Sequence, residues 1–197
     1  MSGDLRIIKT KRTIKNALVD LMAQKEFSDI TISELSERAM INRKTFYRHY
    51  RTINDVVADI ENEILSEFSA ILKSSNASVL DVGSVFRAIS DEIDSRRDFF
   101  TKLMVHNPDI FNNGKIKAML RRALYVSLKS SGDVRDEETL AAVCEFTVSG
   151  VLSLYADWFD KNCTGDLDKL TEISAKIVSE GLRGFVSDEK LSAIRLK

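Results

Sequence analysis

The chain has few of the residues that interrupt helices. Its 197 residues include one proline and eight glycines, the two residue types that most disfavour a helix interior. It also has no long stretch of alternating apolar and polar residues, which is the pattern of a half-buried strand. Hydrophobic residues make up 44% and charged residues 30% of the sequence, a balance typical of a globular protein with a packed core. We therefore predict an all-α protein with about nine helices.

Cysteine is equally scarce, and no motif of an enzyme is present. Cys144 and Cys163 are the only cysteines and are far from a CxxC spacing, which argues against a disulfide scaffold or a structural zinc site. The sequence has no Walker loop, dinucleotide-binding glycine motif or metal-ligand spacing. Cys144 with His106 could supply a nucleophile and a base, but no third orienting group or oxyanion motif accompanies them. We predict no catalytic activity, no metal and no cofactor.

Long apolar runs are missing too. The longest, Leu140 to Cys144, has five residues, whereas a membrane-spanning helix needs about 20. No signal-peptide pattern is visible. We expect a cytoplasmic protein with no membrane partner.

Basic and acidic residues are unevenly distributed along the chain. Residues 1–51 carry 11 Lys+Arg against 6 Asp+Glu, a net charge of +5, while the remainder carries 18 against 24, or −6. A basic segment followed by an acidic one is typical of a phosphate-binding module joined to a domain that does not bind phosphate. A merely uneven surface gives the same totals, so the charge supports a nucleic-acid function without proving it.

The segment from Thr31 to Tyr50, TISELSERAMINRKTFYRHY, predicts two short helices joined by a tight turn. Thr31 can cap the first helix while Glu34 reaches back to it, and Asn42 can cap a second helix that begins at Arg43. Placing Phe46 inward brings Tyr50 beside it. The outward residues of the second helix are then Lys44, Thr45, Tyr47 and Arg48, a basic and aromatic face that suits the major groove of DNA. The alternative is a solvated pair of amphipathic helices.

An earlier helix, from about Thr10 to Lys25, has basic residues crowded at its start. Positive charge there opposes the helix macrodipole, so helix stability does not require it, whereas a nearby polyanion would explain it. A frayed, solvated terminus is the alternative. The basic residues are Arg6, Lys9, Lys11, Arg12 and Lys15.

The rest of the chain is predicted to form a helical body. Thr52 with Asp55 resembles another helix cap, and it opens a long connecting helix. Further helices are expected at about Val82–Ser95, Asp98–Val105, Lys115–Lys129, Glu137–Lys161 and Leu167–Val186. We therefore divide the chain into a DNA-binding domain, residues 1–51, and a connector, effector-binding and dimerisation domain, residues 52–197.

The last two predicted helices are apolar on more than one side, which requires burial on more than one side. Gly150 and Gly181 lie in mid-helix, where glycine costs about 1 kcal/mol relative to alanine, a cost that close helix–helix approach can offset. A four-helix interface with a second copy would meet both requirements, and an intramolecular core is the alternative. The residues that we assign to the interface are Val148, Val151, Tyr155, Trp158, Ile173, Ile177, Gly181, Leu182 and Phe185.

The order of these features resembles the TetR family of bacterial transcriptional regulators. The likeness is strongest over about residues 10–57, where INRKTFYRHY corresponds to the recognition helix, and beyond them it rests on helical layout. Two positions depart from the family pattern: Met40 stands where glycine is common, and Ile53 stands where a lysine often grips phosphate, a contact that Arg51 could replace. The resemblance implies core roles for Leu35, Ala39, Ile41, Phe46 and Tyr50, and DNA contacts from Arg43, Lys44, Thr45, Tyr47 and His49.

These observations together predict a sequence-specific transcriptional regulator, a homodimeric repressor that a small-molecule effector releases from a palindromic DNA operator. A DNA-organising protein, or a regulator controlled by a partner protein, are the alternatives. We expect Arg43 or Lys44 to read guanine edges and Thr45, Tyr47 and His49 to hold phosphates, with further DNA contacts from Arg48, Arg51, Arg12 and Lys15. We expect the effector pocket to be lined by Phe99, Phe100, Met104, Phe111, Met119 and Tyr125, although aromatic spacing alone does not distinguish a pocket from a core. His106 is a further candidate, but its place next to Asn107 and Pro108 at a helix end favours a surface or capping role.

Overall fold

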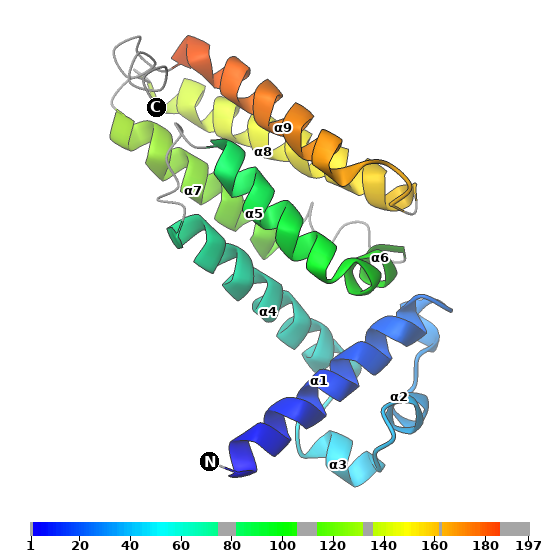
Figure 1. Cartoon of the computed structure of the whole chain (residues 1–197). Coiled ribbons are helices and arrows are strands. Elements are labelled where there is room, and N and C mark those ends of the chain that lie inside the picture. Colours follow the sequence, from blue (N-terminus) through cyan, green and yellow to red (C-terminus); the bar gives the residue numbers. More distant parts are fainter. Residues whose placement is uncertain (1, 75–81, 106–113, 132–135, 162, 186–197) are drawn as a thin grey trace. The chain divides into compact units, whose positions relative to one another are not determined.

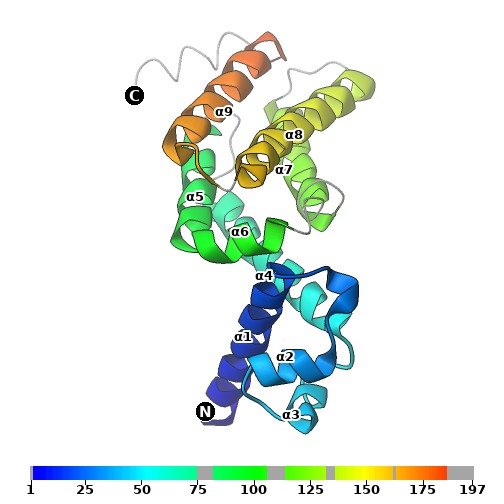
Figure 2. The same cartoon turned by 90° about the vertical axis from the view of Figure 1, so that its right-hand side faces the viewer.

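The computed structural model describes residues 2–74, 82–105, 114–131, 136–161 and 163–185. Within these ranges the chain forms nine α-helices and no strand (Figures 1 and 2), which confirms the all-α prediction. The helices are α1 (Ser2–Met22), α2 (Ile32–Arg38), α3 (Arg43–Tyr47), α4 (Ile53–Ser74), α5 (Val82–Ser95), α6 (Arg97–Val105), α7 (Lys115–Ser131), α8 (Glu137–Asp160) and α9 (Leu167–Leu182). Short 3₁₀ turns lie at Phe27–Asp29 and Arg183–Phe185.

The chain divides into two compact units. The first, which we call the head, contains the chain up to Ile64 and the segment Arg97–Asn107, and thus includes α6; the second, the body, contains the rest. This differs from the predicted boundary after residue 51. The reason is that the first half of α4 buries Val56, Ile60 and Ile64, and that α6 packs against α1.

The turn between α2 and α3 is a Schellman motif. The Ile41 N–H donates to the Ser36 carbonyl and the Met40 N–H donates to the Glu37 carbonyl, both at 2.9 Å, which satisfies carbonyls that the end of α2 would otherwise leave free. The motif requires a left-handed residue just after the helix, and Met40 occupies that position with φ 53°. The position where Met40 departs from the glycine of the family pattern is thus one that favours glycine.

Side-chain caps define where the head helices begin. The Glu34 N–H donates to the Thr31 hydroxyl (3.3 Å) and the Thr45 N–H donates to the Asn42 side-chain oxygen (2.7 Å). The predicted return contact of Glu34 onto Thr31 is replaced by an ion pair between Glu34 and Lys25. The caps that open α2 and α3 are thus at the predicted residues.

The cap of α4 is reciprocal. The Asp55 N–H donates to the Thr52 hydroxyl (3.2 Å), and the Thr52 N–H donates to the Asp55 carboxylate (2.9 Å). The N–H groups of Thr52 and Arg51 (2.8 Å) both donate to the Asp55 carboxylate and hold the pKa of Asp55 below its ordinary value, because hydrogen bonds to a carboxylate favour its charged form.

The body is a bundle in which α5 packs against α9 and α7 against α8 (Figures 1 and 2). One buried cluster joins α7, α8 and α9 through Leu128, Leu140, Cys144, Val178 and Leu182. Asp136 and Asp166 cap α8 and α9 by accepting from the N–H groups of Thr139 and Lys169. The predicted bounds of α5 are confirmed, and those of α7, α8 and α9 are confirmed to within a few residues.

By length and composition, α8 is the one helix in the described part of the chain that could cross a membrane. Such a test is also passed by the core helices of bundles. Within α8 the most apolar window is only 28% buried, so this helix leaves much of its apolar surface uncovered by its own chain.

Candidate nucleic-acid interface and body cavity

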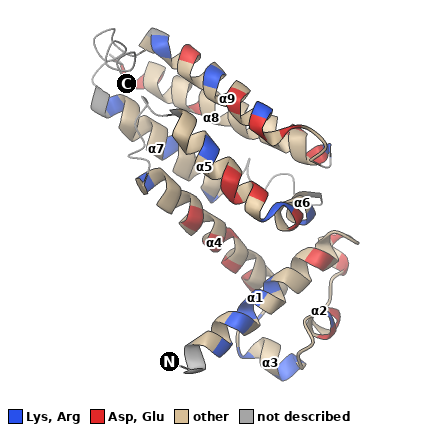
Figure 3. Ribbon diagram, viewed as in Figure 1, with Lys and Arg blue, Asp and Glu red and all other residues tan. Residues whose placement is uncertain are grey.

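The outer face of α3 carries cations and an aromatic ring. Phe46 is fully buried, and its ring lies 6.0 Å from that of Tyr50, so the core face of the helix is fixed. Tyr47, by contrast, is 58% exposed. Arg43, Lys44 and Arg48 are exposed as well. Figure 3 shows Lys and Arg on α3 and on the N-terminal part of α1. The predicted inward and outward residues of α3 lie as expected.

Thr45 does not have a free hydroxyl proton. Its Oγ1 donates to the Asn42 side-chain oxygen (2.9 Å), the same oxygen that caps the helix. A threonine hydroxyl has one proton but two acceptor lone pairs. Thr45 can therefore accept a hydrogen bond from a base amino group, but it cannot donate to a phosphate while this geometry holds. The prediction that Thr45 holds a phosphate is replaced by this acceptor role.

His49 is partly buried at the end of the recognition segment. Desolvation and the neighbouring charges of Arg48 and Lys11 lower the pKa of His49 below its usual 6.5, since each disfavours the protonated ring. His49 is therefore mainly neutral at pH 7 and can donate one N–H to a phosphate without carrying a positive charge.

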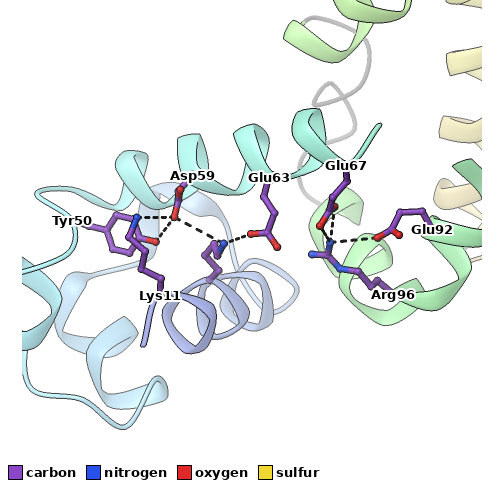
Figure 4. Close-up of polar contacts among 8 residues, drawn as sticks. Lys11, Tyr50, Asp59, Glu63, Glu67, Glu92 and Arg96 are labelled. Atoms are coloured by element: carbon purple, nitrogen blue, oxygen red, sulfur yellow. Dashed lines mark hydrogen bonds and ion pairs between the residues drawn. The ribbon is translucent and has the colours of Figure 1, made fainter. Parts of the chain in front are cut away.

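The basic residues of α1 differ in their availability (Figure 4). The Lys15 ammonium pairs with Glu63 of α4 and lies 4.0 Å from Asp59, and the Lys15 side chain is only 13% exposed. Lys15 is thus engaged inside the head in this structure, and its DNA contact stays a prediction. Arg12 is exposed and remains available, as does Arg51.

A second group of contacts lies beside the Lys15–Glu63 pair and consists of Tyr50, Asp59 and Lys11. The Tyr50 hydroxyl donates to Asp59 (2.6 Å), and the Lys11 ammonium lies 3.4 Å from that carboxylate and 5.2 Å from the Tyr50 ring centre (Figure 4). Partial burial would raise the pKa of Asp59, but the Tyr50 hydrogen bond and the charges of Lys11 and Lys15 lower it overall. Asp59 thus joins the end of the recognition segment to α1 and α4.

In the body, Arg96 makes a separate ion-pair cluster with Glu67 (2.8 Å) and Glu92 (3.6 Å) (Figure 4).

In the head, Asp20 of α1 pairs with Arg38 of α2 (3.0 Å) and Lys102 of α6 (2.9 Å). Burial would raise the pKa of Asp20, but these two cations lower it overall. Through Asp20, α1 is therefore linked both to α2, the first helix of the helix-turn-helix unit, and to α6.

The predicted dimer residues fall into two groups. Five are covered mainly by their own chain: Val148, Tyr155, Trp158 and Leu182 are buried and Val151 is partly buried. The others are exposed: Ile173, Ile177, Gly181 and Phe185. The buried group belongs to the body core; the Trp158 ring N–H, for example, donates to the Gly165 carbonyl (2.9 Å). Phe146 on α8, 83% exposed, is a surface residue that sequence reasoning missed, because it lies in a helix that is apolar all round.

The body contains a cavity of about 140 Å³. Residues of five helices line it: Phe68 and Leu72 of α4; Val85, Phe86, Ile89 and Ile93 of α5; Leu120, Ala123, Leu124 and Ser127 of α7; Thr147, Val148, Val151, Leu152, Tyr155 and Phe159 of α8; and Val178 of α9. None of the described lining residues carries a charged side chain.

The described residues that were predicted to line an effector pocket do not line this cavity. Phe100 and Met104 are buried in α6, a helix of the head, and Phe99 is their neighbour on that helix. Met119 and Tyr125 lie on α7 but not in the cavity lining, and Tyr125 packs beside the Leu128 cluster. His106 and Phe111 fall outside the described residues. The prediction was wrong for this cavity because aromatic spacing does not reveal which face of a helix is covered.

Cys144, the candidate nucleophile of the alternative catalytic hypothesis, is buried and protonated. Cys144 is 1% exposed, and burial raises the pKa of its thiol although the charge of Arg121 acts in the opposite direction. A thiol of this kind stays protonated and inert at neutral pH. In the part of the chain that the structure describes, no group of three or more His, Cys, Asp or Glu side chains is placed to hold a metal ion.

Comparison with models of known protein families gave no match. Among curated proteins, the chain resembles an uncharacterised HTH-type transcriptional regulator, YxbF, of Bacillus subtilis (strain 168), with 38% identity over 48 residues. The matched stretch is 24% of this chain and 13% of that protein, so the likeness covers a small part of either one.

Solved structures match nearly the whole chain. The dihydroxyacetone kinase operon activator DhaS superposes with a TM-score of 0.60 and 16% identity, covering 91% of this chain and 99% of its own. Thermus thermophilus FadR, a TetR-family repressor in complex with lauroyl-CoA, superposes with a TM-score of 0.57 and 17% identity, covering 87% of this chain and 94% of its own. A TetR transcriptional regulator from Streptococcus agalactiae superposes with a TM-score of 0.56 and 18% identity, covering 90% of this chain and 98% of its own. The chain has the fold of TetR-family transcriptional regulators, as the resemblance predicted.

Proposed function

We propose that this chain, which has the TetR-family fold, is a cytoplasmic, DNA-binding transcription regulator that acts as a homodimer on a palindromic operator. The observation that carries the proposal is the outer face of α3. A helix-turn-helix unit with a buried Phe46 presents Arg43, Lys44, Tyr47 and Arg48 to solvent. Arginine and lysine are the residues that most often contact guanine in the major groove, and nothing in the packing of the head requires cations on this face.

A second copy is supported by the uncovered apolar surface of α8 and α9. Phe146, Ile173 and Ile177 are 83%, 44% and 57% exposed, on two helices that pack together. Gly150 and Gly181 are exposed too, and a Cβ added to either would meet no atom of the described residues within 4 Å. The chain's own packing therefore gives no reason for glycine at these helical positions, whereas the close approach of a partner helix does.

Two heads are also needed for affinity. Non-specific binding to DNA is typically weaker than ~10⁻⁶ M at physiological salt, while regulators bind their own sites at roughly 10⁻⁸ to 10⁻¹¹ M. Two α3 helices joined by a symmetric body would read two half-sites about one helical turn apart. The operator would then be a palindrome.

The body cavity is the site that we propose for an effector, and repression relieved by that effector is the regulatory mode. Helix α4 carries Phe68, which lines the cavity, and also Asp59 and Glu63, which pair with α1 of the head. A ligand that favours one position of α4 therefore has a continuous helix through which to act on the head.

The test is operator binding by single-residue variants. An operator is first selected from random duplex DNA and then titrated by fluorescence anisotropy. Lys44→Ala should weaken operator binding by about 1–3 kcal/mol and relax base preference, while Lys169→Ala, an exposed lysine of α9, should bind as the wild type does. If both variants bind the operator as tightly and as selectively as wild type, α3 is not the reading element.

A further inference from the structure

We propose that the body cavity takes a small, uncharged and mainly apolar molecule of about one ring. This inference rests on the proposed function, because it specifies the ligand class of the proposed effector site. It follows from the cavity's lining, from one buried chain of hydroxyl groups and from its volume.

The part of the lining that the structure describes gives a charged ligand no partner. Of its 17 residues, 14 are apolar and the other three, Ser127, Thr147 and Tyr155, are neutral. Moving a charge out of water into such a wall costs several kcal/mol unless an opposite charge or several hydrogen bonds compensate it. A carboxylate or an ammonium group is therefore rejected, while a hydrocarbon ring is accepted.

The Tyr155 hydroxyl belongs to a directed chain of hydrogen bonds. The Thr171 hydroxyl donates to the Leu167 carbonyl (2.7 Å), so its one proton is used. Ser90 lies 2.6 Å from the Thr171 oxygen and 2.9 Å from the Tyr155 oxygen. Ser90 must therefore donate to Thr171, and Tyr155 must donate to Ser90, since each hydroxyl has one proton.

This order fixes what Tyr155 can offer. All three protons of the chain are committed, and Tyr155 retains only acceptor lone pairs. Ser90 and Thr171 are each 4% exposed, so water does not reach them freely to reverse the order. Tyr155 therefore has no proton to donate to a ligand carboxylate while this order holds.

The volume limits the size of the ligand. About 140 Å³ is available, close to the roughly 150 Å³ of an engineered apolar cavity that binds benzene. Drug-sized ligands occupy pockets of about 300 Å³ or more. The cavity therefore fits one six-membered ring with a short substituent, and benzyl alcohol is a suitable probe.

The first experiment compares ligands that differ in charge but hardly in size. Benzyl alcohol, benzoate and benzylamine are titrated into the full-length wild-type protein at pH 7.5, and binding is followed by calorimetry and ligand-observed NMR. Benzyl alcohol should bind saturably with one molecule per chain, and at least about tenfold more tightly than either charged analogue. Equal or tighter binding of benzoate or benzylamine, or no saturable binding of benzyl alcohol, overturns the proposal. No variant is needed for this comparison.

A pair of variants then locates the binding site. Ala123→Phe adds a ring to the cavity wall, whereas Ala118→Phe adds the same ring to an exposed position of the same helix. The first should reduce benzyl alcohol affinity at least about tenfold, as expected where overpacking removes the space for a ligand, and the second should leave it unchanged. Equal affinity of Ala123→Phe and wild type, with circular dichroism showing both folded, places the ligand elsewhere and overturns the proposal.

The ligand class and the regulatory function can be separated. Operator titrations of the ligand-free protein test DNA binding alone, and calorimetry without DNA tests the cavity alone. A protein that binds benzyl alcohol selectively but never binds duplex DNA supports the ligand class and contradicts the proposed function. A protein that binds its operator but prefers benzoate supports the proposed function and contradicts the ligand class.

Discussion

At the scale of single residues, the turn of the helix-turn-helix unit depends on Met40, which holds φ 53° and is 91% exposed. A left-handed conformation costs a non-glycine residue roughly 1–2 kcal/mol, and so exposed a side chain recovers little of this by packing. The hydrogen bonds of Met40 and Ile41 to the end of α2 keep the conformation in place. Glycine, which is common at this position in the family that the sequence resembles, would avoid the cost.

We therefore predict that Met40→Gly stabilises the protein by up to about 1 kcal/mol. Relief of the left-handed strain exceeds the extra entropy of glycine in the unfolded chain, which is roughly 0.4–1 kcal/mol. Met40→Ile should destabilise, because a β-branched side chain is least tolerant of positive φ. Urea unfolding measures both changes as shifts of the midpoint, provided that the dependence of the unfolding free energy on urea is the same in all variants. A lower midpoint for Met40→Gly than for wild type would contradict the proposal that Met40 is strained.

His49 gives a second prediction at this scale, a pH dependence of DNA binding. Its pKa is lowered in the free protein, and a nearby phosphate should raise it. The complex then binds more protons than the free protein does, so operator affinity should increase as pH falls from about 7.5 to 5.5. For folding the sign is opposite: the unfolded chain is protonated first, so the contribution of His49 to stability is lost as pH falls below about 6.5.

The chain has two histidines, which supplies a matched control. His49→Gln should remove most of the pH dependence of operator binding, whereas His106→Gln should retain it. An NMR titration of the ring protons gives the His49 pKa with and without operator. A His49 pKa that does not rise on operator binding would show that this ring does not lie at a phosphate.

At the scale of elements, α3 is a helix of five residues, Arg43–Tyr47, which is too short to be stable by itself. It is held at its start by Asn42, which accepts from both the N–H and the hydroxyl of Thr45, and on its inner face by buried Phe46. The element that carries the proposed function thus depends on one amide side chain and one ring.

Loss of the Asn42 cap should destabilise the head. Asn42→Ala removes the acceptor and should cost about 0.5–2 kcal/mol, while Asn42→Asp keeps an acceptor and should cost less. Thermal unfolding measures the difference. Equal stability of the alanine and aspartate variants would mean that the cap does not hold α3.

The elements also show which features could be read from the sequence. The caps at Thr31 and Asn42 and the inward position of Phe46 follow from local spacing, and the structure contains them. The partner of Lys15 could not be predicted, because Glu63 lies 48 residues away on another helix. The cavity could not be predicted for the same reason, since it exists only where five helices leave space between them.

At the scale of the whole molecule, the proposed dimer depends on the uncovered surface of α8 and α9. Ile177→Glu, at a position 57% exposed in the single chain, should leave the stability of the protomer within about 0.5 kcal/mol but break the dimer, because a buried charge would lack a partner. Leu5→Glu, an exposed apolar position of the head, is the control and should remain dimeric. Sedimentation velocity distinguishes the outcomes, and a dimeric Ile177→Glu would exclude this surface as the interface.

The measurement that tests the central claim most directly is the stoichiometry and salt dependence of operator binding by the wild-type protein. Sedimentation equilibrium with a fluorescent operator duplex should give two chains per duplex, with affinity that falls steeply as salt rises because cations of α3 and α1 displace counterions. A protein that remains a single chain and does not bind duplex DNA at low salt would contradict the account.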